Sequence, residues 1–287
     1  MSHFATVVWN FNPVFFSIGS FEIRWYGVMW ALGFAVSMWL FIDFVRREGY
    51  PPKVFDSIFW FATLSTIIGA RLGHCLFYEP AYFLEHPWQI LNLRQGGLAS
   101  HGAAVGLLLG LWLFSRKNKM PYIWSLDRIM IAVAIAGALV RIGNLLNSEI
   151  YGFETARPWG FIFARAGETV PKHPTQIYEA LCYLVTFGLL LWLYYKKDVA
   201  RRRPGLLFGL GIFMIFATRF GIEFIKNPQE AFEQGMALNM GQLLSLPFIV
   251  AGAWFVIRAL MRPALTPPPL RPWVEPVKKK SDKKHKK

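Results

Sequence analysis

The sequence predicts an all-α integral membrane protein of about seven transmembrane helices, with the N-terminus outside and the C-terminus in the cytoplasm. Two observations support this class. Hydrophobic residues make up 54% of the 287 positions and charged residues only 17%, which is more apolar side chain than one soluble core can bury. Most of the 31 lysine and arginine residues also stand beside one set of helix ends, and this asymmetry sets the orientation.

Seven apolar runs are each roughly 17 to 23 residues long, the length that crosses the hydrocarbon core of a bilayer as a helix. Turn-forming and charged residues separate the runs. We expect the spans at Tyr26 to Val45, Phe55 to Phe77, Leu98 to Phe114, Ile129 to Leu146, Ile177 to Tyr195, Gly205 to Ile225 and Gly241 to Ile257.

Basic residues cluster after the first span, between the third and fourth, between the fifth and sixth, and after the seventh. The positive-inside rule makes these helix ends cytoplasmic. A formal charge of +14 would also fit a nucleic-acid-binding protein. The basic residues do not interleave with aromatic residues on a soluble face, however, and no nucleic-acid motif is present. Membrane lipids, and not nucleic acid, are therefore the expected partners.

Residues 1–262 are predicted to form a single polytopic membrane domain. The segment 147–172, between the fourth and fifth spans, is too long for a tight turn and too polar to insert, so we expect it to form a small external cap. Residues 263–287 are rich in proline and then in lysine, which predicts a disordered cytoplasmic tail that is attracted to anionic lipid headgroups.

Ionisable residues inside the spans mark the candidate site, because a charge at membrane depth costs about 3 kcal/mol and needs a partner or a function. Arg71, His101, Arg141 and Arg219 with Glu223 all fall in the outer half of the bilayer in the predicted topology. They could share one pocket.

One stripe of the fourth span carries Gly137, Arg141, Asn144 and Ser148 at helical spacing. Such a stripe must face protein or water. In one interpretation it is a structural network in which Arg141 pairs with Glu149 or Glu223. In the other it is an anion site, since a guanidinium presents a fork of donors suited to phosphate and asparagine amides can complete the contacts.

His101 stands at the outer start of the third span, after the glycine-rich segment 96–100. Its imidazole has an ordinary pKa near 6.5, so it can accept a proton at neutral pH. The glycines that follow it at 102, 106 and 110 recur every four residues. This spacing predicts a seam along which another helix packs closely.

Two further groups have a structural alternative. Arg219 and Glu223 are i, i+4 neighbours, which favours an intrahelical ion pair. The segment from His173 to Glu179 opens the fifth span, and Pro174 suits the first turn of a helix. Gln176 and Glu179 in this segment would then point into the membrane entrance and need partners there.

No nucleotide-binding loop, zinc signature, serine-hydrolase elbow or dinucleotide fingerprint is present. The two cysteines, Cys75 and Cys182, show neither disulfide nor metal-ligand spacing. We therefore expect no metal and no cofactor.

The motifs of this chain resemble those of the bacterial prolipoprotein diacylglyceryl transferases, in order and up to about Leu260. The 141 to 152 motif is the most specific of them. They are Trp25-Tyr26-Gly27, Gly-Ala-Arg-Leu-Gly at 69 to 73, Ser100-His101-Gly102, Arg-x-Gly-Asn-x-x-Asn-x-Glu-x-x-Gly at 141 to 152, His-Pro-x-Gln-x-Tyr-Glu at 173 to 179, Arg219 with Glu223-Phe224, and Met240-Gly241-Gln242.

The resemblance implies a transferase of the bacterial inner membrane that uses phosphatidylglycerol and a preprolipoprotein signal peptide with a lipobox cysteine. Its expected catalytic residues are His101, Arg141, Arg219 and Tyr26. The expected phosphatidylglycerol-binding residues are Arg141, Asn144, Arg219, Glu149, Gly152 and Arg71, supported by Asn147, His173, Gln176, Glu179 and Glu223. The chain departs from the family pattern at Ala103, Val140, Leu145 and Ile215, the last of which stands where a tyrosine is expected.

The hypothesis for the reaction is that the lipobox thiol, with an ordinary pKa near 8.5, loses its proton to His101 and displaces phosphate from a glycerol carbon. The arginine field alone is an alternative to this base. Arg141, and then Arg219, would stabilise the charge on the departing glycerol phosphate. A lipid or anion transporter is the alternative function, although no internal repeat supports it.

Overall fold

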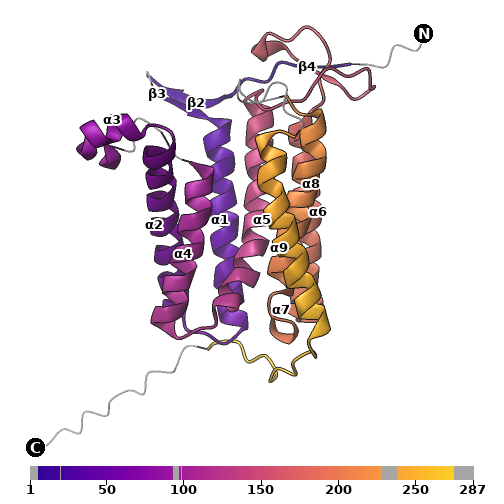
Figure 1. Ribbon diagram of the computed structural model, residues 1–287. Coiled ribbons are helices and arrows are strands. Elements are labelled where there is room, and N and C mark those ends of the chain that lie inside the picture. Colours follow the sequence, from indigo (N-terminus) through magenta and orange to yellow (C-terminus); the bar gives the residue numbers. More distant parts are fainter. Residues whose placement is uncertain (1–5, 20, 93–96, 98, 228–237, 275–287) are drawn as a thin grey trace, which may run out of the picture.

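The computed structural model describes residues 6–19, 21–92, 97, 99–227 and 238–274. Long helices stand side by side in a bundle, and short strands and loops cover one end of it (Figure 1). The long helices are α1 (Trp25–Arg47), α2 (Pro52–Phe77), α4 (Ser100–Asn118), α5 (Tyr122–Leu146), α6 (Thr175–Lys197), α8 (Leu206–Ile222) and α9 (Met240–Met261). Each of them overlaps one of the predicted spans.

Within the described residues, six of these helices are long and apolar enough to cross a membrane. The chain therefore has the make-up of a multi-pass membrane protein. The exception is α4, whose 19 residues begin with Ser100 and His101 and end near Arg116 and Lys117. These polar ends shorten its apolar stretch, so the predicted count of seven spans depends on this helix alone.

Helix α4 nevertheless packs closely along α2, through the predicted glycine seam. A methyl group on Gly102 would lie 2.2 Å from the carbonyl oxygen of Gly69, and one on Gly106 would lie 2.1 Å from that of Ser65. Only a hydrogen atom fits between the two backbones at these points. The packing role predicted for the glycines is confirmed.

Replacing Gly106 by alanine should lower the free energy of unfolding by about 2 kcal/mol, because the obstructing atom is a backbone carbonyl that cannot move aside. Gly188 in α6 has no atom within 4 Å of the equivalent position. Gly188→Ala is therefore the control, and it should leave the protein as stable or slightly more stable. Denaturation in detergent micelles would measure both. Equal stability of the two variants would contradict the close packing of α2 and α4.

Helix α5 begins seven residues before the predicted span. Asp127 and Arg128 therefore lie inside the helix although they precede the predicted span, and they are 0% and 1% exposed. Asp127 accepts hydrogen bonds from the backbone N–H groups of Gly205 (2.8 Å) and Phe208 (2.9 Å). The carboxylate thereby binds N–H groups that lack a partner at the start of α8. Protein partners, and not solvent, accommodate these charges.

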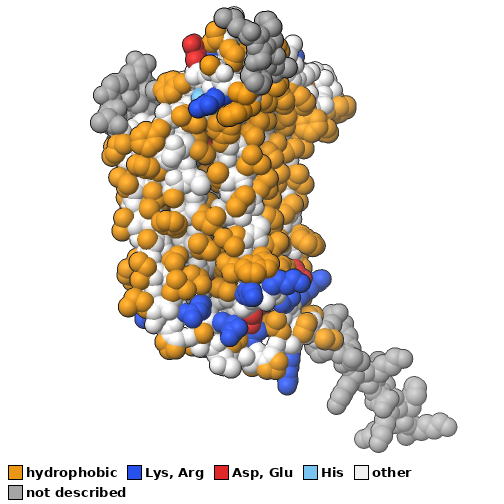
Figure 2. Space-filling model, turned by 90° about the vertical axis from the view of Figure 1, so that its right-hand side faces the viewer, with side chains coloured by type: hydrophobic (Ala, Val, Ile, Leu, Met, Phe, Trp, Pro, Cys, Tyr) orange, Lys and Arg blue, Asp and Glu red, His pale blue; other side chains and the backbone are white. Residues whose placement is uncertain are grey.

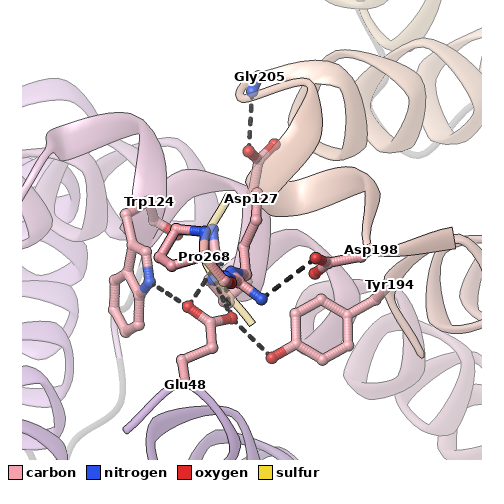
Figure 3. A network of polar contacts seen from close by, with 9 residues as sticks. Glu48, Trp124, Asp127, Tyr194, Asp198, Gly205 and Pro268 are labelled. Atoms are coloured by element: carbon pink, nitrogen blue, oxygen red, sulfur yellow. Dashed lines mark hydrogen bonds and ion pairs between the residues drawn. The ribbon is translucent and has the colours of Figure 1, made fainter. Parts of the chain in front are cut away.

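Arg128 belongs to a buried polar network that joins α5 to the end of α1 and to α6. Figure 3 labels Glu48, Trp124 and Tyr194 of this network. Its Nη2 lies 2.8 Å from Oε1 of Glu48. The same carboxylate accepts hydrogen bonds from Tyr194 (2.7 Å) and from the indole of Trp124 (2.6 Å). Trp124 and Arg128 come from α5 and Tyr194 from α6, and Glu48 directly follows α1, so these contacts tie three helices together at this end of the bundle.

Basic residues gather at the same end. Hydrophobic side chains cover the middle of the bundle, and lysines and arginines lie near its lower end (Figure 2). The last turns of five helices supply Arg46, Arg47, Arg116, Lys117, Lys196, Lys197, Arg201, Arg202 and Arg258. Of the tail predicted from residue 263, the structure describes residues 263–274. They run across this end, where Leu265 N–H donates to Arg202 O and Trp273 N–H to Arg46 O, both at 2.8 Å.

Strands lie at the opposite end (Figure 1). Strand β1 (Val7–Trp9) pairs in parallel with β4 (Phe161–Phe163), and β2 (Val14–Ile18) forms a hairpin with β3 (Phe21–Arg24). The prediction of an all-α protein missed these strands, because three to five residues show too little alternation to be recognised. Pairing of β1 with β4 joins the N-terminal segment to the predicted cap, and the Trp9 indole donates to Leu145 O at 3.0 Å.

Short helices complete the described chain. They are α3 (Pro80–Glu85), α7 (Val199–Arg202) and the 3-10 helices η1 (Pro87–Leu91), η3 (Ala164–Ala166) and η4 (Glu223–Ile225).

Candidate functional site

A strained turn follows α5 at the end of the bundle that carries the strands. The φ angles of Ser148 and Ile150 are 57° and 62°, in the left-handed region that a β-branched residue rarely adopts. Two side chains from the start of α6 support this turn. Thr175 Oγ1 donates to Ile150 O at 2.9 Å, and Gln176 Nε2 donates to Glu149 O at 2.6 Å.

The turn directs Glu149 back toward α5. Its Oε1 accepts a hydrogen bond from Asn144 Nδ2 at 2.8 Å and lies 3.5 Å from Asn147 Nδ2. Three nearby buried oxygen atoms have no hydrogen-bond partner among the described residues, namely Asn147 Oδ1, Ser148 Oγ and Gln176 Oε1. A buried polar atom without a partner costs free energy, so these atoms are candidates to accept hydrogen bonds from a ligand.

Arg141 is the centre of the site. Its Nε lies 2.8 Å from Oε2 of Glu179 on α6, and its Nη1 donates to Asn144 Oδ1 at 3.3 Å. The Glu179 side chain is 0% exposed, whereas the Arg141 side chain is 15% exposed. One interpretation of the sequence paired Arg141 with Glu149 or Glu223. The structure gives it Glu179 instead, because the two facing helices bring α5 and α6 side chains together at this level.

Lys226 is a site residue that the sequence analysis did not identify. Its Nζ lies 3.4 Å from Glu179 Oε1 and 3.6 Å from Glu223 Oε2, and its side chain is 1% exposed. The only signal in the sequence was a basic residue that stands away from the cytoplasmic helix ends. Lys226 and Arg141 therefore hold Glu179 between them.

Glu223 pairs with Lys226 and not with Arg219, so the predicted intrahelical ion pair is wrong. The Glu223 N–H still donates to Arg219 O, as in an α-helix, and the chain then tightens into the 3-10 helix η4, which holds Lys226 within reach of the Glu223 carboxylate. Within the described part of the chain Arg219 makes no ion pair, and it is half-buried. Arg219 stands in the last turn of α8, four residues before Glu223, which pairs with Lys226.

Tyr26 and Gly152 pack against chain neighbours of this group. A methyl group on Gly143, next to Asn144, would lie 2.9 Å from the ring of Tyr26 in the first turn of α1. Gly152 passes close to the chain after α8, since a methyl group there would lie 2.2 Å from Ile225 O. The backbone alone therefore explains the need for glycine at 152.

His173 lies in the cap beside Tyr178, with its Nδ1 3.1 Å from the tyrosine hydroxyl. Burial lowers the pKa of His173, and the charge of Arg157 lowers it further. The imidazole is therefore neutral at pH 7. Its backbone carbonyl accepts a hydrogen bond from Gly152 N–H at 2.9 Å, so His173 supports the cap next to the site.

His101 and Arg71 occupy separate places from the Arg141 group. The His101 side chain is exposed on the first turn of α4 and makes no hydrogen bond or ion pair within the described residues. Arg71 is buried, and its guanidinium donates to the carbonyl oxygens of Ile90 (2.8 Å), Gln89 (2.6 Å) and Gly97 (3.2 Å). These contacts hold the segment after α3 onto α2, beside a cavity of about 720 Å³.

Of the residues predicted to share one pocket, Arg141 and Glu223 belong to one ion-pair network through Glu179 and Lys226. Two cations, Arg141 and Lys226, thus stand among buried glutamates. Arg141 has donors left after its contacts with Glu179 and Asn144, because a guanidinium carries five N–H groups. This arrangement suits an anion with oxygen acceptors, such as a phosphate group. No three metal-ligand side chains lie together in the part of the chain that the structure describes.

Known proteins of one family are similar to this chain over most of its length. Residues 13–258 match the family described as prolipoprotein diacylglyceryl transferase. A phosphatidylglycerol–prolipoprotein diacylglyceryl transferase of Porphyromonas gingivalis is 46% identical over 273 residues, which cover 90% of this chain and 96% of the relative. Proteins of the same name from Bacteroides fragilis and Cupriavidus necator are 41% and 36% identical, each over 88% of this chain and 94% of the relative.

Proposed function

The chain belongs to the prolipoprotein diacylglyceryl transferase family, and we propose that it transfers the diacylglyceryl group of phosphatidylglycerol to the lipobox cysteine thiol of a preprolipoprotein. The product is a thioether, and glycerol phosphate leaves. This is the first step in the maturation of bacterial lipoproteins. The proposal is carried by the half-buried Arg141, which two neighbours hold in place while part of its donor fork stays open.

The reaction makes one C–S bond and breaks one C–O bond. The lipobox thiol gives its proton to a base, and the thiolate attacks the glycerol carbon that bears the phosphate. The bonding electrons of the C–O bond pass to the phosphate, where donors fixed in advance stabilise the new charge. Arg141 is the first of these donors and Arg219 the second. His101 is the proposed base, and its exposed imidazole on α4 is accessible to a substrate thiol.

The headgroup of phosphatidylglycerol supplies hydroxyl donors as well as the phosphate. The unpartnered oxygens of Asn147, Ser148 and Gln176 are acceptors of the kind that these hydroxyls need. Asn144, Glu149 and Gly152 shape the turn that presents them. Arg71 would act at the cavity of about 720 Å³ beside its carbonyl contacts, and Tyr26 would act from α1.

The proposed location is the bacterial inner membrane, with seven spans, the cap of residues 147–172 outside and the C-terminus in the cytoplasm. The gathering of basic residues at one end of the bundle supports this orientation through the positive-inside rule. The Arg141 group lies near the other end, so the active site would face the outer half of the bilayer. The lysine-rich residues 278–287 lie outside the described residues.

Purified protein, phosphatidylglycerol and a lipobox peptide test the function directly. Mass spectrometry should find the peptide heavier by one diacylglyceryl group, and a peptide with serine in place of the lipobox cysteine should stay unmodified. Absence of the product with folded protein would overturn the proposal. Transport of the lipid or its headgroup into vesicles that contain the protein but no lipobox peptide would favour the transporter.

Replacing Gly241 by alanine should lower the reaction rate severalfold. The added methyl group would lie 2.6 Å from Glu223 Oε1, and Glu223 cannot move away without leaving Lys226 short of a partner. Initial rates at saturating peptide would measure the effect. Gly221→Ala is the control, since nothing lies within 4 Å of that position. Wild-type rates for both variants would argue that Glu223 and Lys226 do not contribute to the site.

A further inference from the structure

Lys226 is a buried cation to which the reaction scheme gives no task. Its backbone forms a bridge with Gly152, at the end of the turn that follows α5, and its side chain is 1% exposed. The ammonium group reaches two carboxylates, since Nζ lies 3.4 Å from Glu179 Oε1 and 3.6 Å from Glu223 Oε2. Burying a charge costs free energy unless opposite charges are close, so these two glutamates accommodate the lysine.

The two oxygens of Glu179 face two different cations. Oε2 lies 2.8 Å from Nε of Arg141, and Oε1 accepts a hydrogen bond from Nζ of Lys226. Glu179 is 0% exposed, so both of its oxygens depend on protein partners. The Nη1 group of Arg141 donates to Asn144 instead. Lys226 therefore takes the oxygen of Glu179 that lies away from the Nε contact.

This division determines how many donors Arg141 keeps for a substrate. An arginine and a carboxylate frequently form a bidentate pair, in which two N–H groups of the guanidinium bind both oxygens. In such a pair with Glu179, Arg141 would use a second N–H group on a protein partner. Because Lys226 holds Oε1, that N–H group stays available for the oxygens of a phosphate.

We propose that Lys226 is a positioning residue that keeps Arg141 from closing onto both oxygens of Glu179, and thereby keeps the arginine donors available to the phosphate of the lipid substrate. The inference rests on the proposed function. Lys226 is enclosed between Glu179 and Glu223, so it acts through Glu179 and Arg141. Its effect falls on the lipid and not on the lipobox peptide.

Kinetics of Lys226→Met test this role, because methionine removes the charge and keeps an unbranched side chain. Loss of one donor to the phosphate should raise the KM for phosphatidylglycerol about tenfold and leave the KM for the lipobox peptide within about twofold. Lys226→Arg keeps a cation between the two carboxylates and should stay close to the wild-type KM. Initial rates of thioether formation at several concentrations of each substrate would measure both constants.

Lys172→Met is the matched control. Lys172 also bridges two glutamates, with Nζ 3.3 Å from Glu154 and 3.2 Å from Glu168, and it lies in the cap at the same end of the bundle. Its replacement should change neither KM. An equal rise in the KM for the lipid in Lys172→Met and Lys226→Met would show a general effect of lost ion pairs and would overturn the inference.

Lys226→Met also takes a cation from Glu223, and a second pair of variants separates this effect on folding from positioning. Glu223→Gln and the double variant Glu223→Gln with Lys226→Met differ only at position 226, and the double variant leaves no charge at either place. The added Lys226→Met should again raise the KM for phosphatidylglycerol about tenfold. An unchanged KM between these two variants would overturn the inference.

A double-mutant cycle with Glu179→Gln tests the path through Glu179. A glutamine amide has only one oxygen, so Arg141 cannot form the bidentate pair with it. Lys226→Met should therefore add less than about twofold to the KM for the lipid in this background. Additive effects would overturn the positioning role while thioether still forms, and the proposed function would stand. Absence of thioether with the folded wild-type protein would contradict the proposed function itself.

Discussion

Arg141→Ala should lower kcat/KM by at least about 100-fold, with the protein still folded. Removal of a single donor that stabilises charge in a transition state typically costs a factor of this size. Arg141 supplies more than one donor, and its loss also leaves Glu179, 0% exposed, with Lys226 as its remaining cation. Arg141→Ala should therefore lower the rate more than the replacement of any other single arginine in the site by alanine.

The measurement is the rate of thioether formation at several concentrations of phosphatidylglycerol. Arg165→Ala is the control, since Arg165 is an exposed arginine of the cap. Thermal unfolding of each variant shows whether it has folded. A folded Arg141→Ala protein with more than a tenth of the wild-type kcat/KM would contradict the role of Arg141.

The second large effect concerns stability. Glu48→Ala should lower the free energy of unfolding by about 4 kcal/mol, because removing one partner of a buried ion pair leaves the other charge uncompensated. Arg128 is 1% exposed and has its ion pair only with Glu48 among the described residues. Tyr194 and Trp124 lose the same acceptor.

Denaturation in detergent micelles would measure this change, with Glu22→Ala on the exposed hairpin as the control. A double variant, Glu48→Leu with Arg128→Met, should recover much of the lost stability, since replacing both charges removes the uncompensated one. A loss below about 1 kcal/mol for Glu48→Ala would show that the network does not hold α1, α5 and α6 together.

Helix positions were predictable from the sequence because the length of an apolar run is a local property. The structure confirms that helices occupy these runs, and it moves the start of α5 because Asp127 and Arg128 find buried partners. Those partners come from residues 48 and 205, far away in the sequence. No local pattern contains that information. The pairing of β1 with β4 was missed for the same reason.

The candidate site was predictable in its residue types and only partly in its contacts. The stripe that contains Arg141 and Asn144 follows from helical spacing, and both residues do lie together. The choice of Glu179 as the partner of Arg141 depends on how α5 faces α6. Lys226 joins the site because η4 tightens the chain after α8. Helical spacing from Arg219 could not foresee that change.

The stoichiometry of the leaving group tests the central claim most directly. With phosphatidylglycerol labelled in its headgroup, the account predicts one glycerol phosphate released for each peptide modified, and a peptide–lipid bond that resists hydroxylamine, as a thioether does. Arg141→Ala should lose both products together. Modified peptide without released glycerol phosphate, or a hydroxylamine-sensitive thioester, would show attack at an acyl group and would contradict displacement at the phosphate-bearing carbon.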